Sequence, residues 1–453
     1  MRFLASLSLL LLVPLAHPVT ASAQSTPSAE SAQKWVVAWA GAIQGPYPVG
    51  NPSAQPDMQL AFPSAETGAR DQSFRMIVKP EIWAREARLR FSNVLGVKAV
   101  TFDGVFVALH LASSAVVSGT SRPVTFGGKR SVTIPPGESA WSDAVRLPYV
   151  RHPRDLAGRK LAVSFHVPGE SGPMTWHAKA LQTSYVTMPG AGSMGQDESE
   201  SAFPLSTASW YFLDALDMKM PASAYAIVAF GDSITDGTLS TLNGDDRWPD
   251  VLARRLRVVH GNRVSVVNAG IGGNQVVGPK EYSAQQPFPG GPSAGARLDR
   301  DVLSLSGVST VIWLEGVNDF SKNGNATVEA VQAGMKEIVG RMRAKISGVR
   351  VIGATLTPAL GATNPNHGFP EQDEKRKALN EFIRTGGLFD GVIDFDKAIA
   401  DPTTGAMKAE FVHNTTVGGA GDKLHPNRLG YIAMGMAIDL DLVTAVAAAA
   451  RTR

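Results

Sequence analysis

The spacing of hydrophobic residues divides the chain into two parts. From Trp35 to about Met220, short apolar or alternating runs are separated by turn residues. These runs are 72–78, 86–91, 105–111, 131–134, 160–166 and 180–188. Short runs with period two, broken by Gly and Pro at close intervals, are typical of antiparallel strands. We therefore expect residues 34–221 to form an antiparallel, jelly-roll-like β-sandwich domain.

After Pro221, apolar runs alternate with amphipathic segments. The runs have the length of buried strands and cover 225–230, 264–268, 310–314, 350–356 and 391–395. Two segments between them have apolar residues at helical spacing: Trp248, Val251, Leu252, Leu256 and Val259, then Val328, Val331, Met335, Ile338, Val339 and Met342. Such alternation predicts a parallel sheet covered by helices on both faces. We expect residues 222–453 to form a three-layer α/β/α domain.

The first residues have the pattern of a secretory signal peptide. Arg2 precedes an apolar run that ends near Ala16, and Ala21-Ser22-Ala23 provides a small-residue cleavage site. We expect residues 1–23 to be removed by a cut after Ala23, and the polar residues 24–33 to be a disordered lead-in. The apolar run is too short to span a membrane. The mature protein is thus expected to be secreted or periplasmic, without stable membrane insertion.

Composition narrows the possible chemistry. The sequence contains no cysteine, which excludes a thiol nucleophile and disulfides. Its formal net charge is only +3 and it has no basic run, so a nucleic-acid partner is not expected. Seven histidines lack the spacing of metal ligands: His110, His152, His166, His177, His260, His367 and His413. His177, beside Trp176, is expected to pack in the sandwich. We expect neither a metal nor a cofactor.

A candidate nucleophile follows the first strand of the second part. The run 225–230 is followed by Gly231-Asp232-Ser233. A parallel strand that ends there places the Ser233 hydroxyl at the carboxyl edge of the sheet, where open α/β sheets bind ligands. The same three residues are also typical of a plain turn followed by a helix cap.

Two further blocks follow later strands. The glycine-rich residues 268–274 would let a backbone N–H approach a ligand closely, or would simply form a tight turn. After the run 310–314 come Glu315-Gly-Val-Asn318-Asp319. The Asn318 amide at that edge is suited to a developing oxyanion, although Asn is also a common helix cap.

The fourth block is Asp422-Lys-Leu-His425-Pro426. Asp422 and His425 are close enough in a turn for the carboxylate to hold the imidazole and fix its tautomer, as in a Ser-His-Asp triad. Alternatively, both are surface residues at the start of a helix. Pro426 is expected at the first position of that helix.

These four blocks, in this order, resemble the SGNH or GDSL hydrolase superfamily over about residues 222–442. They match as Gly-Asp-Ser, a Gly after the second strand, Gly-x-Asn-Asp, and Asp-x-x-His before the last helix. The resemblance implies that Ser233 is the nucleophile, His425 the general base and Asp422 the acid that orients the base. The first part of the chain is similar to exported two-domain members.

The resemblance also implies an oxyanion hole. Its donors would be the backbone N–H groups of Ser233 and Gly273 and the side-chain amide of Asn318. A competing motif, Gly291-Pro-Ser-Ala-Gly295, fits the nucleophile elbow, which requires a preceding strand. The Pro- and Gly-rich residues before it cannot form a central strand, so Ser293 is not expected to be the nucleophile.

The resemblance implies a carboxylic ester hydrolase that works through an acyl-enzyme. The insertion 275–297 is rich in Pro, Gly and Gln, which favours a polar rim over an amphipathic lid. We therefore expect a substrate with short acyl groups, acetyl above all. It would be a small-molecule ester or an acylated polysaccharide. Two alternatives remain: a lipase or lysophospholipase for longer chains, and an inactive carbohydrate-binding module. The oligomeric state is not predicted.

Overall fold

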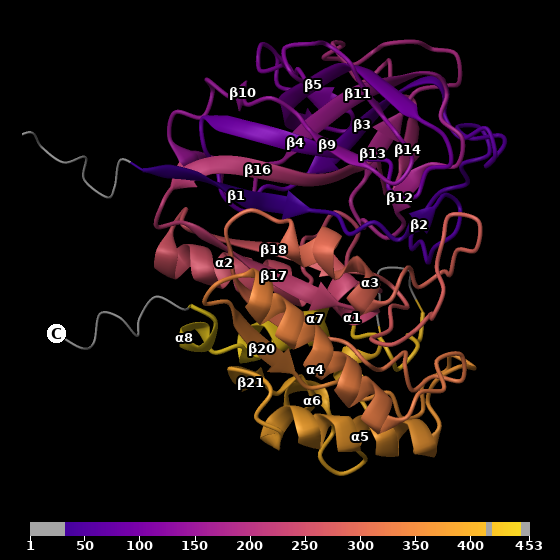
Figure 1. Cartoon of the computed structure of the whole chain (residues 1–453), viewed down its shortest axis with the longest axis vertical. Coiled ribbons are helices and arrows are strands. Elements are labelled where there is room, and N and C mark those ends of the chain that lie inside the picture. The colour runs from indigo at the N-terminus through magenta and orange to yellow at the C-terminus, as the bar shows by residue number, and fades with distance from the viewer. Residues whose placement is uncertain (1–31, 414–418, 445–453) are drawn as a thin grey trace, which may run out of the picture.

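The computed structural model describes residues 32–413 and 419–444 (Figure 1). The expected signal peptide and residues 24–31 of the lead-in lie outside the described residues. Gln33, which was expected in the lead-in, is instead the first residue of strand β1 (Gln33–Ala40). In the described part, no helix is long and apolar enough to cross a membrane.

The first part of the chain forms antiparallel sheets. One contains β1, β16 (Leu213–Pro221), β4 (Glu86–Ser92) and β10 (Val145–Arg146), with β9 (Ser139–Trp141) beside β4. A second contains β14 (Leu205–Thr207), β13 (Ser184–Val186), β3 (Arg70–Val78), β11 (Leu161–Glu170), β5 (Val100–Ala112) and β6 (Ala115–Val116), with β7 (Arg122–Pro123) and β8 (Val132–Ile134) on β5. A small third sheet contains β15 (Trp210–Tyr211), β12 (Thr175–His177) and β2 (Gly45–Pro46).

An aromatic core joins the two larger sheets. The ring of Phe91 on β4 lies 5.2 Å from that of Phe102 on β5 and 5.1 Å from that of Phe165 on β11. All three side chains are fully buried. Burial of a phenylalanine contributes on the order of 2 kcal/mol, so these contacts between sheets stabilise the region strongly. The first part of the chain is therefore antiparallel and rich in strands, as predicted.

The second part of the chain contains a parallel sheet. Its order is β18 (Val264–Gly270), β17 (Tyr225–Gly231), β19 (Val308–Leu314), β20 (Arg350–Ala354) and β21 (Gly391–Ile393). Each strand lies within or overlaps one of the predicted apolar runs. The last run was predicted to extend through Phe395, but Phe395 begins a helix because the Asp394 side chain accepts the N–H of Lys397 and caps that helix.

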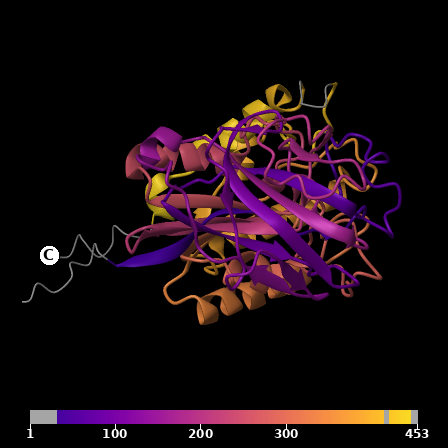
Figure 2. The ribbon, with the colours of Figure 1, turned by 90° about the horizontal axis from the view of Figure 1, so that it is seen from above.

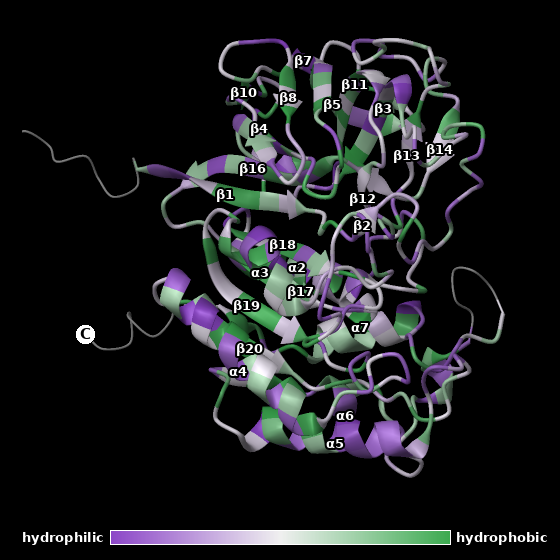
Figure 3. Cartoon of the chain, turned by 45° about the vertical axis from the view of Figure 1, so that its right-hand side comes forward, coloured by the Kyte–Doolittle hydropathy of each residue, from purple (hydrophilic) through white to green (hydrophobic). Residues whose placement is uncertain are grey.

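Two groups of helices accompany this sheet (Figure 3). Helices α2 (Trp248–His260), α6 (Phe395–Ile399) and α7 (Arg428–Ala437) contact one another, as do α3 (Ala294–Leu298), α4 (Val328–Lys345) and α5 (Pro370–Thr385). The short elements are α1 (Ser233–Asp236), α8 (Leu440–Val443), a π-helical turn (Asp299–Leu303) and two 3-10 turns (Pro153–Leu156 and Ala409–Phe411).

The predicted inner faces of α2 and α4 are mostly buried. The buried residues of α4 are those expected, Val331, Met335, Ile338, Val339 and Met342, whereas Val328 is only partly buried. Val259 of α2 was predicted to be buried but is 60% exposed. The reason is that Leu256 is the last buried residue of α2, so the final turn contributes nothing to the core despite its helical spacing.

Strand β1 connects the two parts of the molecule. It lies beside β18, and the N–H of Val37 donates to the carbonyl oxygen of Ser306, 2.9 Å away. Seen from above, the antiparallel strands overlie the second part (Figure 2). Arg90 pairs with Asp214 within the first part and also crosses this junction, because it donates to the hydroxyl of Ser304. The division into domains at residues 221 and 222 stays a prediction.

Candidate active site

Ser233 lies where the carboxyl ends of three parallel strands meet. Gly231 at the end of β17 is paired with Gly270 of β18 and Leu314 of β19, so the blocks that follow these strands share one edge of the sheet. A side chain at Gly231 would place its Cβ 2.2 Å from the Leu314 carbonyl oxygen, which explains the glycine. Asp232 then caps α1 by accepting the N–H of Ile234. Ser233 is the first residue of that helix and is only 5% exposed.

His425 connects Ser233 to Asp422. Its Nε2 atom lies 2.8 Å from Oγ of Ser233, and its Nδ1 atom lies 2.6 Å from Oδ2 of Asp422. An ionised carboxylate only accepts hydrogen bonds, so Nδ1 carries the proton and Nε2 is free to accept from the serine hydroxyl. The structure thus brings together the three residues that the sequence singled out.

The loop before His425 holds Asp422 in its ionised form. The other carboxylate oxygen of Asp422 accepts the N–H groups of Leu424 and His425. Burial by itself would raise the pKa of Asp422, but the hydrogen bonds and charge of His425 outweigh burial and lower the pKa to about 2. Asp422 is therefore a permanent hydrogen-bond acceptor for the imidazole near neutral pH.

The helix after His425 begins later than predicted. Pro426 was expected at its first position, but α7 starts at Arg428. Asn427 is the cap, because its side-chain oxygen accepts the N–H of Gly430 at 3.1 Å. An Asn side chain supplies the acceptor that a helix start needs, which Pro lacks.

Asn318 and Asp319 tie the third block to the second. The side-chain amide of Asn318 donates to the carbonyl oxygen of Asn274, 2.9 Å away, while α4 is capped by Thr327 rather than by Asn318. The Asp319 carboxylate accepts the N–H groups of Val276 and Val277 at 2.8 and 3.0 Å. Burial raises the pKa of Asp319 to about 7, although these N–H groups favour its charged form.

The glycine block permits close backbone approach. Gly273 has φ of +82°, and a Cβ on it would lie 2.8 Å from the side-chain nitrogen of Asn51. The preceding N–H, of Gly272, donates to Oδ2 of Asp236 on α1 at 2.9 Å. The conformation therefore favours glycine at position 273, and a side chain there would also displace Asn51.

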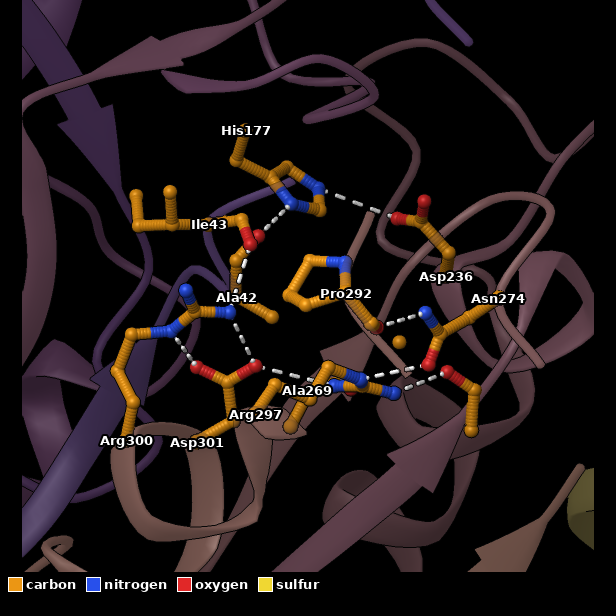
Figure 4. Close-up of polar contacts among 12 residues, drawn as sticks. Ala42, Ile43, His177, Asp236, Ala269, Asn274, Pro292, Arg297, Arg300 and Asp301 are labelled. Atoms are coloured by element: carbon orange, nitrogen blue, oxygen red, sulfur yellow. Dashed lines mark hydrogen bonds and ion pairs between the residues drawn. The ribbon is translucent and has the colours of Figure 1, made fainter. Parts of the chain in front are cut away.

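A buried arginine, which the sequence analysis did not identify, fixes these strand ends (Figure 4). The guanidinium of Arg297 donates to Oδ1 of Asn274 and to the carbonyl oxygens of Ala269 and Gly231, all within 2.8 Å, and pairs with Asp301 at 3.1 Å. The spacing of Arg297 and Asp301 suits a helical ion pair, but the other partners become neighbours only through the fold.

The first part of the chain also reaches the site. His177 is buried and stacks on Trp210, as expected for a packed residue, but its Nε2 atom also lies 3.2 Å from Oδ1 of Asp236 (Figure 4). Lys179 is likewise buried, and its Nζ atom donates to Oγ1 of Thr238 at 2.6 Å. Burial lowers the pKa of Lys179, whereas nearby carboxylates, that of Asp236 first, raise it.

A second histidine lies near the candidate triad. Burial, followed by the charge of His425, lowers the pKa of His367 to about 4, so this imidazole is neutral at neutral pH. Its Nδ1 atom accepts a hydrogen bond from the Gln372 amide at 2.7 Å. The N–H of Thr363 in the same loop donates to the Asp422 carbonyl oxygen at 2.9 Å.

Ser293 has a structural position. It caps α3, and its hydroxyl accepts the N–H of Ala296 at 3.3 Å. Turns rather than a strand precede it, so the nucleophile-elbow geometry is not formed. Within residues 32–413 and 419–444, no group of three or more His, Cys, Asp or Glu side chains is arranged to hold a metal ion.

Comparison with known proteins finds a family match in the second part of the chain. Residues 229–433 match the GDSL-like lipase/acylhydrolase family. Similar solved structures include a carbohydrate acetylesterase from Sinorhizobium meliloti (16% identity, 47% of this chain and 95% of that chain, TM-score 0.36). Another is an aryl esterase from M. smegmatis (18% identity, 47% of this chain and 96% of that chain, TM-score 0.37). A third is a lipase/acylhydrolase from Enterococcus faecalis (25% identity, 47% of this chain and 92% of that chain, TM-score 0.34). No curated protein matches the chain. Residues 229–433 thus form a GDSL-like lipase/acylhydrolase domain, and the chain is a carboxylic ester hydrolase.

Proposed function

We propose that the chain is an exported serine esterase that hydrolyses short-chain carboxylic esters through Ser233, His425 and Asp422. The observation that carries this proposal is the continuous hydrogen-bond chain from the serine hydroxyl through the imidazole to the carboxylate, with links of 2.8 and 2.6 Å. This order of donors and acceptors is the one that transfers a proton from a serine hydroxyl to a base.

In the first half of the reaction, Oγ of Ser233 attacks the ester carbonyl carbon while Nε2 of His425 takes the hydroxyl proton. The imidazolium that forms is stabilised by the Asp422 carboxylate, which stays ionised because its pKa is about 2. The tetrahedral intermediate then collapses. The proton on Nε2 passes to the leaving alcohol, and an acyl-enzyme remains on Ser233.

In the second half, a water molecule takes the place of the alcohol. Nε2 of His425 removes a proton from this water, which attacks the acyl carbonyl carbon. Collapse of the second tetrahedral intermediate returns the proton to Oγ of Ser233 and releases the carboxylic acid. Every proton moves between Ser233, His425, substrate and water, so the cycle needs no cofactor.

We assign oxyanion stabilisation to the backbone N–H groups of Ser233 and Gly273 and to the amide of Asn318. The Asn318 amide has two hydrogens, and the bond to the Asn274 carbonyl uses one of them, which leaves the other for substrate. In comparable enzymes one oxyanion donor contributes about 3 kcal/mol to transition-state stabilisation.

The insertion 275–297 supports a preference for short acyl groups. Its first residues are anchored by Asp319, and Val276 is buried, so this apolar side chain is not offered to a substrate. Further along, the Asn274 amide donates to the carbonyl oxygens of Gly290 and Pro292. A segment held at both ends is suited to a fixed rim rather than to a mobile lid over a long acyl chain.

Two measurements test the proposal. A fluorophosphonate should label the protein once, on Ser233, and Ser233→Ala should abolish labelling while Ser293→Ala labels normally. Absence of labelling in the wild type would instead favour the inactive binding module. The kcat/KM values for p-nitrophenyl acetate, butyrate, octanoate and palmitate should fall along the series. A preference for octanoate or longer would favour a lipase or lysophospholipase.

Export is part of the proposal and rests on residues 1–23. Expression with the full sequence in a bacterium should yield a processed protein whose first residue is Gln24. N-terminal sequencing of the exported material checks the position of the cut, and retention of the unprocessed chain in the cytoplasm would contradict it.

A further inference from the structure

Two side-chain amides from the first part of the chain hold the backbone at the glycine block. Nε2 of Gln44 lies 3.0 Å from the carbonyl oxygen of Gly272 and 2.6 Å from that of Pro289. Nδ2 of Asn51 lies 2.8 and 3.3 Å from the same two oxygens. Each amide therefore uses both of its hydrogens on this pair of carbonyls. Because both facing atoms are acceptors, the nitrogen and not the oxygen of each amide must face them.

The direction of the Gly272 carbonyl sets the direction of the Gly273 N–H. The two groups belong to one planar trans peptide, in which C=O and N–H point in opposite directions. By attracting the carbonyl, Gln44 and Asn51 turn the Gly273 N–H away from themselves. This N–H is the group that we assign to the oxyanion hole.

This peptide needs external support. It joins two glycines, and Gly273 has φ of +82°, so no side chain of its own favours one peptide orientation over the other. A rotated peptide would present the Gly272 carbonyl oxygen, instead of an N–H, to a developing negative charge. Such a rotation would remove one donor and add repulsion.

The N–H of Gly272 is held by Asp236 on α1, and the antiparallel part contacts this carboxylate in turn. The N–H donates to Oδ2 of Asp236, whose Oδ1 atom lies 3.2 Å from Nε2 of His177. The Nδ1 atom of His177 in turn lies 2.5 Å from the Ala42 carbonyl oxygen (Figure 4). The antiparallel part thus holds the C=O of Gly272 directly and its N–H indirectly, through the contact of His177 with Asp236.

We propose that Gln44 and Asn51 are positioning residues that lock the Gly272–Gly273 peptide in the orientation required for oxyanion binding. The antiparallel part of the chain is then a working component of the catalytic centre. This inference rests on the proposed function, because it concerns how a donor of the same oxyanion hole is oriented.

The test exchanges each donor for an acceptor of the same shape. Gln44→Glu and Asn51→Asp place a carboxylate oxygen against the two carbonyls, which should favour the rotated peptide. We expect kcat for p-nitrophenyl acetate to fall by about 100- to 1000-fold, the range for loss of one oxyanion donor, with KM within about threefold of the wild type. Inhibition by phenylboronic acid, which forms a tetrahedral adduct with the serine, should weaken by a similar factor.

Two controls match the charge and the location. Gln55→Glu adds the same charge in the same segment, but Gln55 contacts Thr207 and Ser209 instead of Gly272. Tyr282→Phe removes a hydrogen bond to the Gln44 carbonyl oxygen and leaves the Gln44 amide untouched. Both variants should keep kcat and phenylboronic acid inhibition within about twofold of the wild type. A milder variant, Asn51→Ala, removes one of the two amides at a partly exposed position and should reduce kcat by about tenfold if the acidic variants do not fold.

The outcomes separate this proposal from the catalytic assignment. If Gln44→Glu and Asn51→Asp, or Asn51→Ala in their place, retain the kcat and boronate affinity of the two controls, the proposed positioning role of Gln44 and Asn51 is wrong. A loss confined to thermal stability or to KM overturns it as well. If instead fluorophosphonate fails to label Ser233 in the wild type, the proposed function is wrong. If only the positioning role of Gln44 and Asn51 is wrong, the wild type is still labelled.

Discussion

Ser233 and His425 are 192 residues apart in the sequence, yet Oγ of the serine lies 2.8 Å from Nε2 of the histidine. The parallel sheet brings them together. Strand β17 delivers the serine to its carboxyl edge, and the loop before α7 delivers the histidine to the same place. This contact is the basis of the first prediction.

Ser233→Ala and His425→Ala should each reduce kcat for p-nitrophenyl acetate by about 10⁴-fold or more, as is usual for triad residues. The double variant should be little worse than either single one, because the two groups carry out one proton transfer together. Steady-state kinetics of the three variants checks this. Multiplicative losses would mean that the two residues act independently, and substantial activity in Ser233→Ala would exclude it as the nucleophile.

Asp422 should make stability depend on pH in the acid range. Its pKa is lowered from 3.8 to about 2, so the folded state favours the charged form. The resulting stabilisation, about 2 kcal/mol, is fully present above pH 4 and is lost as the pH falls through about 2. Asp422→Asn removes it at every pH. The difference in unfolding free energy between wild type and variant, measured with urea, should therefore shrink from pH 5 to pH 2, and a constant difference would contradict the assignment.

Some of this molecule could be predicted from local pattern alone. Continuous apolar runs located the parallel strands, and helical spacing located α2 and α4, since both patterns depend on neighbouring residues. Asp422 and His425 were also accessible, because a turn of four residues is enough to bring them into contact. The end of the last strand and the start of α7 were misplaced by capping at Asp394 and Asn427, where one side-chain acceptor outweighs the apolar pattern.

The rest depends on contacts between distant segments. Gln44 and Asn51 meet Gly272 more than 200 residues away, and nothing in their own surroundings marks them as part of a site. Arg297 is similar, because three of its acceptors come from other elements. The pairing of Ser233 with His425 was expected only through the resemblance to a known superfamily, since no local pattern relates two residues so far apart.

Asp319 should be required to place the start of the insertion 275–297, directly after the second block. Asp319→Ala removes the acceptor for the N–H groups of Val276 and Val277 and leaves two buried donors unpaired, each at a cost of about 1–3 kcal/mol. We expect a lower melting temperature together with a kcat at least tenfold lower. Asp319→Asn retains one acceptor oxygen and should be intermediate in both measurements. Equal activity of Asp319→Ala and wild type would show that the segment keeps its position without this carboxylate.

The last prediction concerns Arg297, whose guanidinium is fully buried and has four different partners. Arg297→Ala leaves two backbone carbonyls without this donor and Asp301 with Arg300 as its remaining partner, and breaking a buried pair costs up to about 3–5 kcal/mol. Arg297→Lys should recover little of that loss, because an ammonium group cannot reproduce the planar fork that reaches Asn274, Ala269 and Gly231 at once.

Arg343→Ala is a matched control. Arg343 also pairs with an aspartate, Asp390, but both side chains are exposed, so the cost should be about 1 kcal/mol or less. Urea unfolding at pH 7 measures all three variants. A lysine variant as stable as the wild type would mean that Arg297 contributes only its charge, and not the directed hydrogen bonds that join the strand ends beneath Ser233.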